Sequence, residues 1–176
     1  MGNGKDKGNR TIRLPENDAT AQEWAGAVGR FFQAMGLLET ITMEFVARMA
    51  EGFKFKSIKK KYLSQKITFV IEGLAEHSDA DAPAVSEIQD ALEEVRQLSF
   101  FRNVLAHGAT GLSGPDADGA PPRITGLLNY RPDDADQEAE IVSLDEIKGR
   151  LAEAEALAAK LAGLFNGLKF APLERT

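Results

Sequence analysis

The residues best suited to chemistry lie in one short stretch of the chain, at Arg102, Asn103 and His107. Asn103 and His107 are four residues apart, so on a helix they share one face. The imidazole of histidine titrates near neutral pH, while the guanidinium of arginine stays charged and binds anions such as phosphate. The stretch therefore predicts an electropositive cluster that contains one group able to transfer a proton.

The helix that must position this cluster is predicted to run from about residue 83 to residue 107. Pro83 suits a first helical position, and Gly108 is a natural stop directly after the helix. The inward stripe of this helix is expected to step by three and four residues along Val85, Ile88, Leu92, Val95, Ser99, Arg102 and Ala106. Arg102 would then stand where valine or leucine is expected, and a buried guanidinium needs a carboxylate, a phosphate or water beside it.

Arg102 and His107 also have an ordinary structural interpretation. Arg102 can pair with a carboxylate at the edge of the core, such as Glu39 or Glu44. His107 can cap the end of its helix, where the helix dipole favours a cation. From the residues alone, this interpretation stays open beside a catalytic one.

Three further amphipathic helices are predicted around the one that carries the cluster. They run over about residues 17–49, 57–76 and 143–168, each with apolar side chains recurring every three to four residues. None of these helices can bury its apolar stripe alone. We therefore expect an all-α fold, an up-down bundle of four to five helices.

A small β-hairpin is expected before the last helix. Residues 123–130 and 138–142 read as short strands, and the turn between them is polar. The segment 108–122 is rich in glycine and proline, which is typical of a loop. The bundle is thus predicted to carry one hairpin over about residues 123–142.

The size and composition of the chain indicate a single folded domain. The chain has 176 residues, 43% of them hydrophobic. We expect the domain over residues 17–170, with tails at 1–16 and 171–176. The polar N-terminal stretch lacks the apolar core of a secretory signal, and no apolar run reaches the roughly 18 residues of a membrane-spanning helix. The interpretation is a cytoplasmic protein that makes no membrane contact.

The residue types also limit the cofactors to be expected. There is no cysteine, which excludes disulfides, thiolate nucleophiles and cysteine-ligated zinc. His77 and His107 are the two histidines, too few for a histidine-rich metal site. The acidic pairs of the predicted loops lack the ligand spacing of a calcium loop. We expect no metal and no cofactor.

Charge is distributed unevenly along the chain. The net charge is −6, yet residues 1–66 hold 12 Lys and Arg against 7 Asp and Glu. The basic residues are densest in the stretch 54–66. Four of them are candidates for RNA binding, Lys56, Lys59, Lys60 and Lys61. The alternative interpretation is a solvated helix face, because lysine runs on exposed helices are common.

The stretch from Arg102 to His107 (RNVLAH) resembles the motif of HEPN domains, in which an arginine, a polar residue that is often asparagine, and a histidine lie late in a helix. The helix pattern over roughly residues 18–168 is similar to that family as well. The resemblance implies a metal-independent endoribonuclease that acts as a homodimer, with the motifs of two protomers facing each other across a shared cleft. A toxin or an antiviral defence effector is the implied role, with a separate antitoxin or a nucleotidyltransferase as a further partner.

The resemblance also implies a role for each motif residue. His107 would transfer the proton of the attacking 2′-hydroxyl or of the leaving oxygen. Arg102 would neutralise charge on the scissile phosphate, and Asn103 would orient the histidine or the phosphate. Arg102 and His107 are about 140° apart around an ideal helix, so a second copy would complete the site. Two other functions stay open, a non-catalytic HEPN-like module that binds RNA, a nucleotide or a protein, and a purely structural helical oligomer.

Overall fold

The longest helix, α1 (Ala19–Met49), provides the axis of the fold. Its buried stripe repeats every seven residues at Trp24, Phe31, Leu38 and Phe45. Thr42 interrupts this apolar face and is fully buried, but its hydroxyl donates a hydrogen bond of 2.8 Å to the carbonyl oxygen of Leu38. The polar group of Thr42 is therefore satisfied, and the stripe stays continuous.

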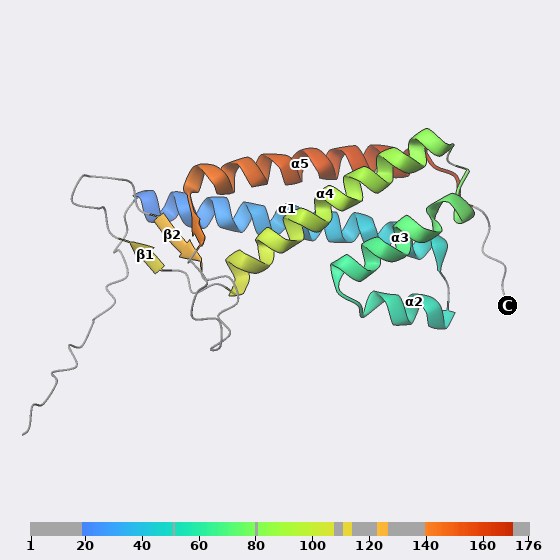
Figure 1. Ribbon diagram of the computed structural model, residues 1–176, viewed down its shortest axis with the longest axis horizontal. Coiled ribbons are helices and arrows are strands. Elements are labelled where there is room, and N and C mark those ends of the chain that lie inside the picture. The colour runs from blue at the N-terminus through green and yellow to red at the C-terminus, as the bar shows by residue number, and fades with distance from the viewer. Residues whose placement is uncertain are drawn as a thin grey trace, which may run out of the picture.

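The computed structural model describes residues 19–50, 52–79, 81–107, 111–113, 123–126 and 140–170. Within these ranges the helices after α1 are α2 (Gly52–Lys59), α3 (Leu63–His77), α4 (Ala82–His107) and α5 (Leu144–Gly167). They alternate in direction along the chain (Figure 1). The buried side chains of the bundle form one core. The expected all-α bundle is confirmed. The tails expected at 1–16 and 171–176 lie outside the described residues.

The helices α1 and α5 lie side by side and run parallel. Ion pairs join Glu23 to Lys148 and Arg30 to Glu155, so both helices advance by seven residues between the two pairs. In Figure 1, α4 crosses in front of α1, and α3 with the short α2 covers the lower right of the bundle. Each amphipathic stripe is thus buried against at least one neighbour.

The single helix expected over residues 57–76 is wrong, because the structure breaks it into α2 and α3. Tyr62 has an extended backbone at the break (φ −64°, ψ 156°). Its N–H donates to Oε1 of Gln65 at 3.3 Å, which satisfies a backbone group that no helix hydrogen bond reaches. Lys56 lies three and four residues before Lys59 and Lys60, the spacing at which like charges on a helix repel each other and weaken it.

The inward face of α4 differs from the prediction at its C-terminal end. The expected stripe continued from Val95 through Ser99, Arg102 and Ala106, but the buried residues that follow Val95 are Leu98, Phe101, Val104 and Leu105. Both continuations keep helical spacing. The second buries far more apolar area, so the helix turns that side to the core and Arg102 to the surface.

Three short antiparallel strands lie between α4 and α5, in the order β1 (Gly111–Ser113), β2 (Arg123–Gly126) and β3 (Glu140–Val142). The pairing of β2 with β3, with Ile124 opposite Val142, occupies the position of the expected hairpin. β1 was not predicted. Buried Val142 fixes the start of α5, which Ser143 caps by accepting a hydrogen bond from the Glu146 N–H at 3.1 Å.

Candidate functional site

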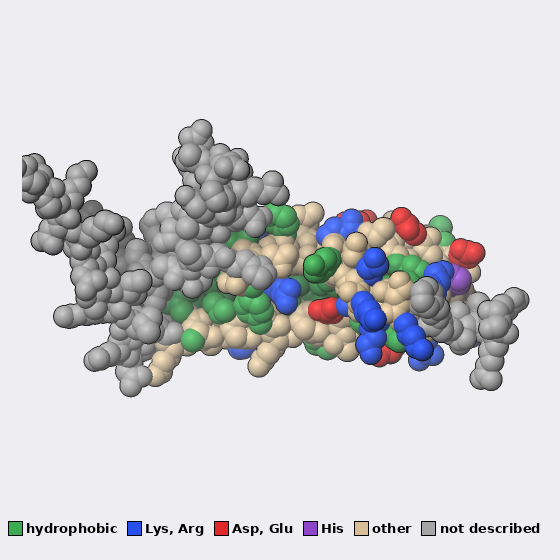
Figure 2. Space-filling view, turned by 90° about the horizontal axis from the view of Figure 1, so that it is seen from below, with side chains coloured by type: hydrophobic (Ala, Val, Ile, Leu, Met, Phe, Trp, Pro, Cys, Tyr) green, Lys and Arg blue, Asp and Glu red, His purple; other side chains and the backbone are tan. Residues whose placement is uncertain are grey.

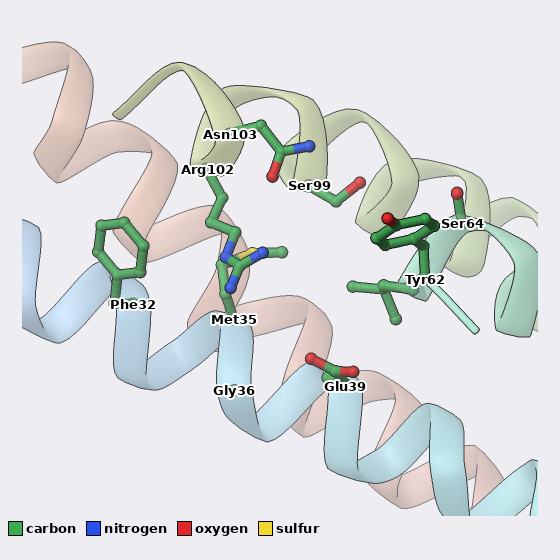
Figure 3. A pocket seen from close by; sticks show the side chains of 10 residues that line it. Phe32, Met35, Gly36, Glu39, Tyr62, Ser64, Ser99, Arg102 and Asn103 are labelled. Atoms are coloured by element: carbon green, nitrogen blue, oxygen red, sulfur yellow. The ribbon is translucent and has the colours of Figure 1, made fainter. Parts of the chain in front are cut away.

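A small pocket lies where the C-terminal part of α4 faces α1 and the start of α3 (Figure 3). Its volume is about 220 Å³. The side chains that line it include both charges, hydroxyls and two aromatic rings: Phe32, Met35, Gly36, Glu39, Tyr62, Leu63, Ser64, Ser99, Arg102 and Asn103. Two of the three predicted catalytic residues are among them.

Arg102 is exposed and points into this pocket from α4 (Figure 3). Its guanidinium carbon lies 5.9 Å from the centre of the Phe32 ring, a cation–π contact. Among the residues that the structure describes, no carboxylate lies within ion-pair distance of Arg102. The interpretation that Arg102 is buried and pairs with Glu39 or Glu44 is therefore wrong, and no described carboxylate competes with an anion for its guanidinium.

Asn103 is exposed and lines the same pocket, one helical position beyond Arg102. His107 is the last residue of α4, and its side chain lies outside what the structure describes. On the helix backbone, His107 is about 40° around from Asn103 and roughly 6 Å further along the axis. The backbone of α4 thus places all three motif residues at one end of the helix.

Glu39 reaches the pocket from α1 and is held there by Lys66 of α3. Nζ of Lys66 donates to Oε1 of Glu39 at 2.6 Å. The lysine side chain is only 7% exposed, whereas the glutamate side chain is 42% exposed. The pair therefore presents a fixed carboxylate to the pocket, with its counter-charge buried behind it.

Glu39 and Tyr62 are pocket residues that the sequence analysis did not assign to a site. Lys66 was counted in the basic run, although it lies four residues before Val70, on the apolar stripe of α3. That position was the available signal that Lys66 faces inward. Tyr62 had no periodic signal, because it stands at the break that divides the expected helix.

The four lysines proposed for RNA binding form a separate patch. Lys56, Lys59, Lys60 and Lys61 are exposed on α2 and on the turn after it. In Figure 2, basic side chains gather at the end of the molecule where α2 and α3 lie. None of the four lines the pocket, but Lys61 directly precedes Tyr62 at its rim. The patch therefore lies beside the pocket.

A second hollow lies on another face of the bundle, between α1 and α5. Its volume is about 490 Å³, and its walls are mostly alanine, leucine and isoleucine side chains. Over the described ranges, no group of three or more His, Asp or Glu side chains is arranged to hold a metal ion. Nor does any helix there have the length and apolar character needed to cross a membrane.

Comparisons of the chain with protein-family models, with curated proteins and with solved structures found no match. What supports a function is therefore the chemistry of the pocket and the motif at the end of α4.

Proposed function

We propose that this protein is a metal-independent endoribonuclease of the HEPN type, acting as a homodimer. The single observation that carries the proposal is the exposed guanidinium of Arg102, which has no carboxylate partner in the described part of the chain and shares a pocket with Asn103. Arg30, by contrast, has a carboxylate partner in Glu155 at 2.7 Å. A guanidinium without one is suited to bind phosphate, which matches its planar fork of donors.

The reaction proposed for the site is an internal transfer at phosphorus. The 2′-oxygen of one nucleotide bonds to the adjacent phosphorus, and the bond to the 5′-oxygen of the next nucleotide breaks. One histidine takes the proton of the 2′-hydroxyl, and a protonated histidine gives a proton to the leaving 5′-oxygen. The products are a 2′,3′-cyclic phosphate and a 5′-hydroxyl.

Arg102 would neutralise the charge that develops on the non-bridging phosphate oxygens during this transfer. Asn103 would orient the phosphate or the imidazole through its amide. His107 is about 140° around the helix from Arg102, so one copy presents the two groups on different sides. A second copy that faces the end of α4 would bring two imidazoles and two guanidinium groups to one phosphate.

The proposal is tested by induced expression of the wild type beside Arg102→Ala and His107→Ala, with growth and total RNA integrity followed together. We expect the wild type to arrest growth and fragment RNA, and both variants to do neither. Arg30→Ala is the matched control, because it removes an exposed arginine outside the pocket. Intact RNA in all four cultures, at equal levels of folded protein, would contradict the proposal.

A second candidate is a non-catalytic module that binds RNA. It is favoured by the described side chains of the pocket, because Arg102, Asn103 and Tyr62 can bind a ligand through hydrogen bonds and no histidine is among them. In that case the purified wild type would bind RNA and leave it uncut, and Arg102→Ala would weaken binding while His107→Ala would not.

A further inference from the structure

We infer that the pocket beside Arg102 binds one guanine base of single-stranded RNA, with Tyr62 stacking on the base and Glu39 accepting its hydrogen bonds. The inference rests on the proposed function for the presence of RNA. It adds a recognition step, because it names the base that lies next to the phosphate held by Arg102.

The size of the pocket suits a single base. Its volume is about 220 Å³, below the roughly 300–1,000 Å³ of pockets that hold drug-sized ligands. Figure 3 shows Arg102 and Tyr62 towards opposite ends of the pocket, Glu39 on the α1 side, and Ser99 and Asn103 on the α4 side. A planar group between them would meet an anion-binding residue, a ring and a carboxylate.

Tyr62 is an unusually open aromatic side chain, with 81% of its surface exposed. In the described part of the chain no other ring contacts it. Its backbone is fixed, because the N–H is bonded to Gln65 and the residue opens α3. An exposed ring on a fixed backbone is suited to stack on an unpaired base, which is how proteins commonly hold single-stranded RNA.

Glu39 gives the pocket a preference among the bases. An ionised carboxylate only accepts hydrogen bonds. The Watson–Crick edge of guanine carries two adjacent donors, N1–H and the N2 amino group, which a carboxylate accepts together. Adenine and cytosine place a ring-nitrogen acceptor beside their amino group, and uracil flanks its one donor with carbonyl oxygens. Those acceptors would face a carboxylate oxygen, so guanine is the best match.

Lys66 explains how a carboxylate can lie in a pocket for an anionic ligand. Its buried ammonium is 2.6 Å from Oε1 of Glu39 and balances that charge. With Arg102 included, the three charged groups sum to one positive charge, so a phosphate is still attracted. The ion pair also fixes the orientation of the carboxylate, which a recognition residue requires.

The test is a titration of the wild-type protein with the 3′-monophosphates of guanosine, adenosine, cytidine, uridine and inosine at low salt, followed by NMR or calorimetry. We expect guanosine 3′-monophosphate to bind at least tenfold more tightly than the other four. Inosine lacks only the N2 amino group, so it isolates the second hydrogen bond to Glu39 without any change in the protein. Binding of guanosine and inosine within twofold of each other, or of all five within twofold, would overturn the inference.

Variants assign the preference to residues. Glu39→Gln should reduce the advantage of guanosine to within twofold of adenosine, and Tyr62→Ala should weaken all five nucleotides about tenfold, while Tyr62→Phe keeps their affinities. Glu44→Gln is the matched control, an exposed glutamate of α1 outside the pocket, and should change nothing. An unchanged guanosine preference in folded Glu39→Gln would overturn the role of Glu39.

The titration needs no RNA cleavage, so the two proposals fail separately. If the protein cuts RNA but binds all five nucleotides equally, the base pocket is wrong and the nuclease proposal stands. If it prefers guanosine but leaves RNA intact, the base pocket stands and the nuclease proposal is wrong.

Discussion

The helix α1 separates two hollows that differ in their chemistry. Glu39 borders the smaller one, together with Arg102 and Tyr62. Leu37 borders the larger one, about 490 Å³ in volume, together with alanines of α5. Leu37 and Glu39 are two residues apart, about 200° around the helix, so the hollows lie on different sides of α1. The larger hollow is lined mostly by apolar side chains, so it is less suited to catalysis than the smaller one.

The two arginines beside these hollows show what distinguishes the sides. Arg30, at the apolar hollow, is paired with Glu155 at 2.7 Å. Arg102, at the polar pocket, has no carboxylate partner in the described ranges. Its guanidinium makes a cation–π contact with the ring of Phe32. We therefore place the proposed site at Arg102, whose charge has no described carboxylate partner, and not at the larger hollow.

The largest expected effect concerns the polar pocket and the proposal that two copies complete its site. Arg102→Ala and His107→Ala should each lower the rate of RNA cleavage about 10³-fold. The first removes charge neutralisation at the phosphate, and the second removes proton transfer. When the two inactive variants are mixed, mixed dimers retain one arginine for charge neutralisation and one of the two histidines for proton transfer, so the activity should recover in part, by at least tenfold over either variant. No recovery in the mixture would contradict a composite site. Either variant incubated alone at the same total concentration is the control.

The next prediction tests which side of α4 faces the core. Phe101 is 9% exposed and packs edge-on against Phe31 at 5.4 Å between ring centres, whereas its neighbour Phe100 is 62% exposed. Phe101→Ala should lower the free energy of unfolding by about 3 kcal/mol, and Phe100→Ala by less than about 0.5 kcal/mol. Denaturant unfolding measures both. Equal losses would mean that the register of α4, and so the outward position of Arg102, is wrong.

A smaller effect is expected on the apolar side. Leu37 is exposed, so Leu37→Asp should change the free energy of unfolding by no more than about 1 kcal/mol. It should leave both RNA cleavage and the self-association measured by sedimentation within twofold of the wild type, because the proposed dimer forms at the end of α4. Loss of the dimer in this variant would place the interface on the α1–α5 side, where the two motifs cannot meet.

The smallest effect concerns the ion pair that joins α1 to α5 on the apolar side. The hydrogen bond from Lys148 to Glu23, together with the charge of Glu23, raises the pKa of the lysine above its ordinary value. A raised pKa means that the pair stabilises the fold at neutral pH and that this contribution is lost as the pH rises through the pKa of the folded state. The Tm of Lys148→Ala should therefore lie slightly below that of the wild type at neutral pH, and the difference should vanish above that pKa. A difference that grows with pH would contradict this.

The helices were largely predictable from the sequence, because their apolar residues recur with helical spacing. The seven-residue repeat of Trp24, Phe31, Leu38 and Phe45 gave α1 directly. The break at Tyr62 was missed, although Ile58 lies five residues before Leu63, about 140° around an ideal helix, so the apolar spacing of α3 does not continue from α2. A local hydrogen bond between Tyr62 and Gln65 decides it, and periodicity carries no information on that bond.

The place of Arg102 and Asn103 late in α4 was predictable from the sequence, but their environment was not. The motif indicated Arg102, Asn103 and His107, yet the stripe placed Arg102 inward because Ser99 and Arg102 also keep helical spacing. The side of α4 that faces the core depends on packing against α1, where the ring of Phe31 contacts the ring of Phe101. Glu39 and Lys66 are 27 residues apart, so their pairing follows from the packing of α1 against α3 and has no local signal.

The most direct test of the nuclease proposal is the incubation of purified protein with a single-stranded RNA and with the same sequence as DNA. The expected result is cleavage of the RNA alone, with 2′,3′-cyclic phosphate and 5′-hydroxyl ends, lost in Arg102→Ala and kept in Arg30→Ala. Uncut RNA at concentrations where the protein is dimeric, or equal cleavage by Arg102→Ala, would show that the polar pocket is not a ribonuclease site.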